Sequence, residues 1–149
     1  MGFTAFERNE DRYRWSGVEV KSYPGGGTQS RGACKQVLFA AEHGLHSELR
    51  YFELEPGGYS ALERHEHVHA VLILRGRGRA VLDTRVVDVA EHDLVYVEPN
   101  TWHQFLAGAD SYLGFLCAVN NERDRPCRPS EDDIARLERI PEVSLAIRY

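Results

Sequence analysis

Three histidines and two glutamates fall within one short segment of this chain, at Glu63, His65, Glu66, His67 and His69. A fourth histidine follows further along, in the segment Pro99-Asn-Thr-Trp-His103. Imidazole and carboxylate side chains are ligands that first-row divalent metals prefer in proteins. The two segments together predict a metal site, and the functional interpretation depends on them.

The spacing of these residues requires a bend in the chain. On a regular strand alternate residues share a face, so Glu63, His65, His67 and His69 would all point the same way. His65 and His69 would then lie about 13 Å apart, at about 3.3 Å per residue. Each imidazole nitrogen must come within about 2.1 Å of the ion. We therefore expect the chain to bend within residues 64–68, a stretch rich in charged residues.

Short strand-like segments separated by turn residues surround the two histidine segments. They cover residues 35–40, 48–54, 69–74, 79–83, 86–89, 94–97, 102–107 and 112–119. Eight short strands at this spacing predict an all-β sandwich or barrel rather than a βαβ fold.

The two ends of the chain have a different character, although we expect all 149 residues to form one domain. Residues 1–32 are predicted to be an N-terminal arm that ends in a flexible glycine-rich loop, Tyr23–Gly32, and residues 33–120 the barrel. Residues 121–129 are polar and broken by prolines, which predicts a loop across the barrel surface. Ser130-Glu-Asp-Asp133 matches a capping box, and Ile134, Leu137 and Ile140 follow at helical spacing. One short C-terminal helix, ended by Pro141, is expected.

The glycine and histidine spacing resembles the two sequence motifs of the cupin family. Gly57, Glu63, His65, His69 and Gly76 match the first motif, and the segment from Asp93 to His103 matches the second. Glu63 stands where cupins usually carry a first histidine, and His92 replaces the usual glycine before Asp93. The resemblance implies a double-stranded β-helix, or jelly-roll barrel, with a metal inside. The ligands that it implies are Glu63, His65, His69 and His103.

The resemblance leaves His67 outside the ligand set, and we expect His43, His46 and His92 in solvated turns. Three imidazoles and one carboxylate suit one divalent transition metal: Fe, Mn, Ni, Co or Zn. The order of affinities does not choose among these ions. Trp102 and Phe105 are expected in the core, and Cys117 as a buried, inert thiol.

Three functions are compatible with such a site. Many small single-domain cupins are dioxygenases, so the resemblance implies a metal-dependent oxidoreductase that acts on a small organic substrate. The alternative enzyme is an isomerase or lyase in which the metal polarises a carbonyl, with Glu66, Tyr51 or Tyr96 as acid or base. The third possibility is a module that binds a small molecule without turnover. One fold hosts many activities, so the fold alone does not decide.

The composition bears on partners and location. A formal net charge of −5 and a pI near 5.8 do not suit nucleic-acid binding, and no apolar run is long enough to span a bilayer. The widely spaced Cys34, Cys117 and Cys127 contain no CxxC pair, which favours a reducing, cytoplasmic location. Small cupins commonly dimerise, and we expect a homodimer to which the aromatic arm at Tyr13–Trp15 contributes.

Overall fold

The computed structural model describes residues 2–8, 12–23 and 30–149 of the chain. Most of the predicted glycine-rich loop, residues 24–29, lies outside the described residues. The strands are β1 (Phe6–Arg8), β2 (Tyr13–Trp15), β3 (Lys21–Tyr23), β4 (Arg31–Phe39), β5 (Ser47–Tyr59), β6 (His69–Leu82), β7 (Arg85–Ala90), β8 (Leu94–Val97), β9 (His103–Ala107) and β10 (Leu113–Asn120). A short 3₁₀ helix spans Ala41–His43, and two α-helices, α1 (Glu131–Leu137) and α2 (Pro141–Ala146), follow the last strand.

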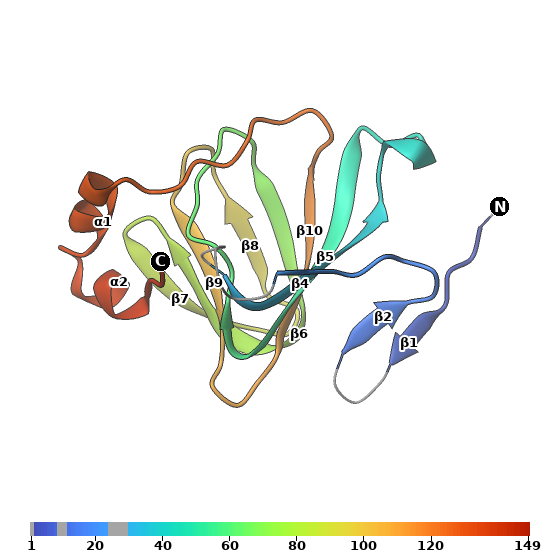
Figure 1. Cartoon of the computed structure of the whole chain (residues 1–149), viewed down its shortest axis with the longest axis horizontal. Helices are drawn as coiled ribbons and strands as arrows, with labels where there is room; N and C mark the ends of the chain where they lie inside the picture. The colour runs from blue at the N-terminus through green and yellow to red at the C-terminus, as the bar shows by residue number, and fades with distance from the viewer. Residues whose placement is uncertain (1, 9–11, 24–29) are drawn as a thin grey trace.

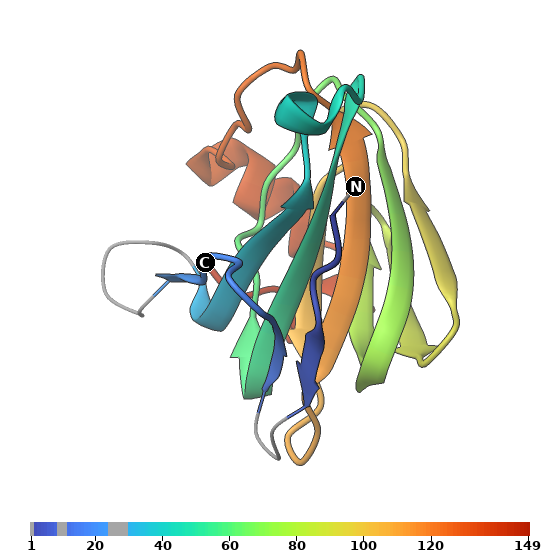
Figure 2. The same ribbon diagram turned by 90° about the vertical axis from the view of Figure 1, so that its right-hand side faces the viewer.

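The strands β3 to β10 form one antiparallel sheet that curls into a barrel (Figure 1). Strands β4, β5, β10 and β6 follow one another across the face seen in Figure 2, and each is hydrogen-bonded to the next. Strand β6 also pairs with β7, β8 and β9. The all-β barrel predicted from the sequence is therefore confirmed.

Strand β6 is longer than the sequence suggested, because the expected turn at residues 75–78 is a bend within one strand. Its first half pairs with β8, and its second half pairs with β7 and β9. Gly76 has a φ of 71°, and a Cβ on Gly78 would lie 2.1 Å from the carbonyl oxygen of Leu106. The two glycines let the backbone turn from one side of the barrel to the other without breaking the ladder.

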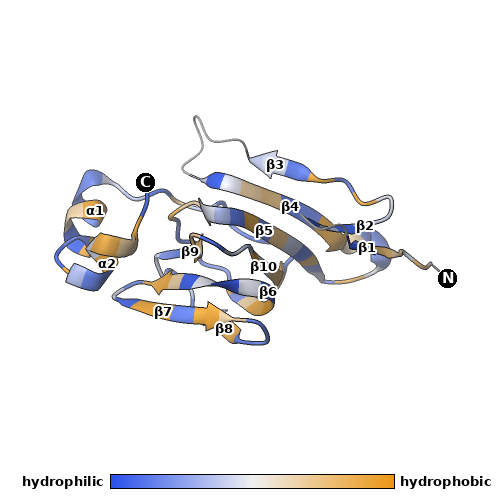
Figure 3. Cartoon of the chain, turned by 90° about the horizontal axis from the view of Figure 1, so that it is seen from below, coloured by the Kyte–Doolittle hydropathy of each residue, from blue (hydrophilic) through white to orange (hydrophobic). Residues whose placement is uncertain are grey.

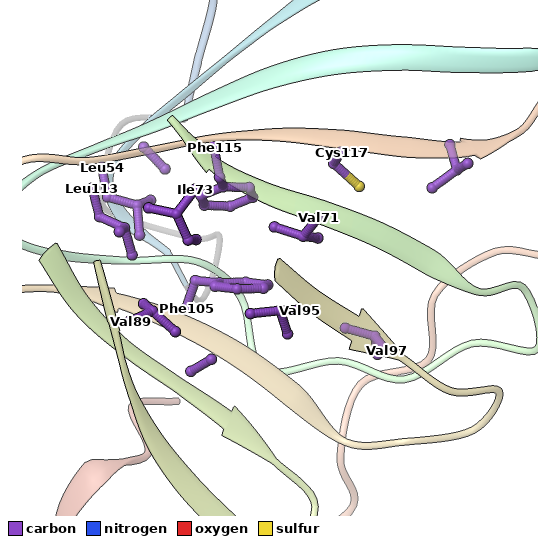
Figure 4. Packing of buried hydrophobic residues seen from close by; sticks show 13 residues of the cluster. Leu54, Val71, Ile73, Val89, Val95, Val97, Phe105, Leu113, Phe115 and Cys117 are labelled. Carbon is purple, nitrogen blue, oxygen red and sulfur yellow. The ribbon is translucent and has the colours of Figure 1, made fainter. Parts of the chain in front are cut away.

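The barrel interior is apolar over most of its length. Alternate residues of β6 and β10 point inward, among them Val71, Ile73 and Phe115, and each is at most 4% exposed. They meet Phe105 of β9, whose ring lies 4.5 Å from that of Phe115 between centroids. Figure 4 shows these side chains directed into the space between the strands.

The C-terminal helices lie at one end of the barrel (Figure 3), and a second apolar cluster joins them to it. Ser130 caps α1 as predicted, because its hydroxyl accepts from the backbone N–H of Asp133 and its own N–H donates to the Asp133 carboxylate. The prediction of a single helix is wrong: Pro141 occupies the first turn of α2, where a missing N–H costs nothing. Leu137, Val143 and Trp102 are each at most 1% exposed in this cluster.

The N-terminal arm forms a hairpin of β1 and β2 at the opposite end from the helices (Figure 1). The rings of Tyr13 and Trp15 lie 6.1 Å and 5.1 Å from that of Tyr51 on β5, and Gln36 donates to the carbonyl of Tyr13. The aromatic arm thus packs on its own barrel, and its contribution to a homodimer stays a prediction. No helix in the described residues is long and apolar enough to cross a membrane.

Replacement of Leu137 by alanine tests the docking of the helices. Leu137 is 1% exposed, so the variant should lose about 2–5 kcal/mol in the free energy of unfolding, measured in urea. Leu145→Ala, in α2, is the matched control, because Leu145 is 76% exposed and its loss should cost less than about 0.5 kcal/mol. Equal effects of the two substitutions would show that the helices do not pack as described.

Candidate metal centre

Three buried histidines meet inside the barrel. His65 follows the end of β5, His69 is the first residue of β6, and His103 is the first residue of β9. They are 2%, 8% and 3% exposed, and one ring nitrogen from each lies within 4.8 Å of the other two. Among the described residues, these three histidines are the group that is able to hold a metal ion. The structure thus brings together three of the four predicted ligands.

The backbone around His65 places these rings. The predicted bend is present at Glu66 and His67, so β6 begins only at His69. Glu63 and His103 form an antiparallel bridge, with N···O distances of 3.2 Å and 2.9 Å. The bridge joins two segments that are separated in the sequence by the strands β6, β7 and β8.

Hydrogen bonds to backbone carbonyls orient two of the rings. Nδ1 of His65 lies 2.6 Å from the carbonyl oxygen of His67, and Nδ1 of His103 lies 3.0 Å from that of Thr101. A carbonyl oxygen only accepts, so each Nδ1 carries the proton, and in the neutral ring Nε2 keeps its lone pair. Nε2 of His65 is buried and has no hydrogen-bond partner among the described residues. A divalent cation would satisfy this nitrogen, so the site fits a metal.

Burial also keeps the three rings in the form that binds metals. It lowers the pKa of His65 and His69, and it lowers the pKa of His103 to about 4. The neighbouring histidines lower all three pKa values further, because a positive charge on one ring disfavours a charge on the next. The rings are therefore neutral at physiological pH, as metal coordination requires.

Glu63, the fourth predicted ligand, is not in the group of close donor atoms. Its Oε2 lies 3.4 Å from Nη1 of Arg128. Burial raises the pKa of this carboxyl, and the positive charge of Arg128 opposes the effect. Coordination by Glu63 stays a prediction.

His67, which we expected to lie outside the ligand set, packs directly against the cluster. Its ring stacks on that of His65 at 3.6 Å between centroids, and its Nε2 lies 3.3 Å from Nε2 of His69. Its Nδ1 lies 2.7 Å from the carboxylate of Asp124, which also accepts the backbone N–H groups of Glu66 and His67. These N–H groups lower the pKa of Asp124 and keep it charged. Asp124, in the loop after β10, thus holds both the bend and the His67 ring in place.

A cavity of about 350 Å³ opens onto three of these histidines, His65, His67 and His69. Its polar lining includes Lys35, Arg50, Arg123 and Arg128, and its apolar lining includes Phe52 and Leu54. A larger depression of about 570 Å³ is lined by residues of β6, β7 and the end of β9, but no histidine lines it. The smaller cavity is therefore the candidate substrate site.

Several other expectations are resolved by position. Glu66 and Tyr96 are exposed, Tyr51 donates to Glu53, and none of these three lines the cavity as the structure describes it. His43, His46 and His92 are exposed. Trp102 and Phe105 are buried as predicted. Cys117 is also buried, which raises its pKa, and Nη2 of Arg50 lies 3.4 Å from its sulfur.

Metal analysis of purified variants tests the ligand set. His65→Ala and His103→Ala should each abolish the stoichiometric divalent metal, measured by elemental analysis, because each removes one of three close donors. His46→Ala, an exposed histidine outside the site, should retain the metal of the wild type. Retention of full metal content by the His103 variant would rule out the three-histidine site.

The stability of the metal-free protein should depend on pH through these histidines. The unfolded chain binds protons on histidine below about pH 6.5, whereas folded His103 does so only near pH 4. The free energy of unfolding should therefore fall as the pH decreases from 6.5 towards 4, by up to about 1.4 kcal/mol per pH unit for each such histidine.

Urea unfolding in the presence of a chelator measures this dependence. In His103→Gln the free energy of unfolding should fall less steeply with decreasing pH than in the wild type, because the variant lacks one group that the folded state keeps unprotonated. An unchanged slope in this variant would contradict the assignment.

Comparison with known proteins agrees with this geometry. The sequence model of the cupin domain family matches residues 50–119. A curated protein of Rhodospirillum rubrum, 1-methylthio-D-xylulose 5-phosphate methylsulfurylase, is 50% identical over 133 residues, which cover 89% of this chain and 85% of that protein.

Two crystal structures are also similar. A cupin 2 conserved barrel domain protein from Rhodopseudomonas palustris is 44% identical, with a TM-score of 0.92 over 99% of this chain and 100% of the other. A cupin-2 domain protein from Rhodospirillum rubrum is 48% identical, with a TM-score of 0.87 over 93% of each chain. The resemblance seen in the histidine spacing and the predicted jelly-roll barrel are both confirmed, and the chain belongs to the cupin family.

Proposed function

We propose that this protein is a metal-dependent enzyme that removes the methylthio group from a 1-methylthio-2-ketose phosphate. The observation that carries the proposal is the cluster of three neutral, buried histidines beside a cavity of about 350 Å³. The substrate class is taken from the relative of Rhodospirillum rubrum, which is 50% identical over 89% of this chain. This is the Lewis-acid alternative of the sequence-based hypotheses, with a carbon–sulfur bond as the bond that breaks.

The chemistry of such a substrate explains the need for a metal. In a 1-methylthio-2-ketose the carbon–sulfur bond lies next to a ketone. When this bond breaks, the electron pair can remain on C1, because the ketone oxygen shares the charge. A divalent metal held by His65, His69 and His103 would polarise that ketone as a Lewis acid.

Because the electron pair of the carbon–sulfur bond stays on C1, the methylthio group must be transferred to a nucleophile that donates an electron pair to its sulfur. A thiol is a nucleophile of this kind. The thiol sulfur bonds to the methylthio sulfur, the C1–S bond breaks, and C1 takes a proton. The products are a 1-deoxy-2-ketose phosphate and a methyl disulfide. Carbon is reduced, the sulfur atoms are oxidised to a disulfide, and the thiol is consumed as the co-substrate.

The residues of this chain have defined tasks in the proposal. The carbonyls of His67 and Thr101 fix the tautomers of His65 and His103, so both Nε2 atoms are available as donors. Phe52 and Leu54 form an apolar wall on the cavity. Beside such a wall the attraction between a metal and a ketone oxygen is stronger than in bulk water.

Turnover under anaerobic conditions tests the proposal. The purified, metal-loaded protein should convert 1-methylthio-D-xylulose 5-phosphate and a small thiol to a methyl disulfide, detected by mass spectrometry. Removal of oxygen should not change the rate, and a redox-inert metal should support the reaction. His103→Ala should lose activity at least about 100-fold through loss of the metal, whereas His46→Ala should not. The absence of any disulfide product with the loaded wild type would refute the proposal.

The dioxygenase hypothesis remains a second candidate, because a histidine-rich site also suits iron and manganese. It predicts that protein loaded with Fe(II) or Mn(II) consumes dioxygen with enediols, diketones, flavonols or thiols as substrates. An oxygen electrode distinguishes the two hypotheses, since the removal of a methylthio group consumes a thiol and no dioxygen.

A further inference from the structure

The cavity beside the histidines carries an excess of positive charge. Four cationic side chains line it, from Lys35, Arg50, Arg123 and Arg128, and among the described residues Glu63 is its acidic lining residue. Such an imbalance favours an anionic ligand, because a partly enclosed cavity concentrates the field of its charges.

Three of these four cations are already paired with acidic side chains. Arg50 and Arg123 both contact Glu48, with N···O distances of 3.5 Å and 3.1 Å. Arg50 also contacts Cys117, so its guanidinium is held on two sides. Among the described residues the acidic partner of Arg128 is Glu63, at 3.4 Å, which is long for a charged hydrogen bond.

Lys35 differs from the arginines because its ammonium group makes no hydrogen bond or ion pair with any residue that the structure describes. It lies on β4 directly opposite Phe52 of β5, which also lines the cavity. Arg128, Arg50 and Lys35 line the cavity together with Glu63, and Nη1 of Arg128 lies 3.4 Å from Oε2 of that carboxylate. Because the backbone of Glu63 is bridged to His103, these charges act close to the histidine cluster.

We propose that Lys35 and Arg128 form a subsite for the phosphate group of a substrate whose ketone faces the three histidines. The inference rests on the proposed function and deepens it by naming residues that select a phosphorylated substrate. A phosphate monoester carries a charge of about −1.5 to −2 at neutral pH and three strong acceptor oxygens. The free ammonium of Lys35 supplies a compact charge, and Arg128 supplies a guanidinium able to exchange its long contact with Glu63 for a phosphate oxygen.

The size of the cavity agrees with a single small substrate. Its volume of about 350 Å³ lies near the lower end of the range of small-molecule sites, about 300–1,000 Å³. His65 and His69 line the same cavity as the two cations, so one pentulose phosphate would meet both groups at once. The ketone end and the phosphate end of the substrate are thereby recognised by different side chains.

Binding of a non-reacting substrate analogue tests the subsite without any turnover. D-xylulose 5-phosphate lacks the methylthio group, and D-xylulose also lacks the phosphate. Isothermal titration calorimetry on the metal-loaded protein should show that Lys35→Gln and Arg128→Gln each weaken binding of the phosphorylated sugar by at least about tenfold. Neither should change binding of D-xylulose by more than about twofold.

The other lysine of the chain, Lys21, gives a matched control. Lys21 lies opposite Lys35 on β3, pairs with Glu19 and is 57% exposed in its side chain. Lys21→Gln makes the same change of charge outside the cavity and should leave binding within about twofold of the wild type. Lys35→Arg, which keeps the charge, should restore most of the affinity, and equal melting temperatures would exclude unfolding as the cause of a loss.

The two proposals fail in different ways. If D-xylulose 5-phosphate binds in a manner that depends on Lys35 but no methylthio group is released, the proposed reaction is wrong and the phosphate subsite stands. If the methylthio group is released and both glutamine variants keep the wild-type KM and the wild-type affinity for D-xylulose 5-phosphate, the reaction stands and the subsite is wrong. An equal loss of affinity in Lys21→Gln would also overturn the subsite, because it would show a general effect of charge.

Discussion

Backbone pairing between the segment after β5 and the start of β9 holds the site together, and the two hydrogen bonds between Glu63 and His103 are its centre. The pairing joins two segments that lie far apart in the sequence. One segment carries His65 and leads through the bend into His69, and the other begins β9 with His103. The carbonyls of His67 and Thr101 then set the directions of the His65 and His103 rings, and the carboxylate of Asp124 sets that of the His67 ring. Apolar side chains of the barrel interior, among them Val71 and Phe105, fill the space beyond the histidines.

The site places opposing demands on the protein. Nε2 of His65 is buried without a partner in the described residues, and burial disfavours protonation of the rings. The unpaired nitrogen costs stability in the metal-free protein, yet it is the atom that a cation would contact. The cavity also carries unbalanced charge, because its cationic side chains outnumber the acidic groups that line it, and this excess would attract an anion. The histidines of the cavity suit a metal, and its cations suit the negative charge of the substrate that we propose.

The sequence alone predicted the barrel, the bend and the three histidines, because alternation of apolar residues and motif spacing are local properties. It did not predict that His67 joins the cluster, since the partner that orients it, Asp124, lies in a loop without any periodic pattern. The sequence also did not predict that Lys35 lines the cavity, because a single lysine in a strand resembles a surface residue. Two interpretations of turns were wrong for a shared reason: the glycines near Gly76 and the proline at Pro141 permit a bend or begin a helix as readily as they end one.

The neutral state of the buried histidines has a consequence for the exchange of protons with solvent. A metal that binds to protonated rings must displace protons, whereas the lowered pKa values leave His65, His69 and His103 unprotonated at neutral pH. Metal uptake would therefore release almost no protons from these rings into the surrounding buffer. The heat of metal binding would then be the same in buffers of different ionisation enthalpy, and the affinity would change little between neutral and moderately alkaline solution.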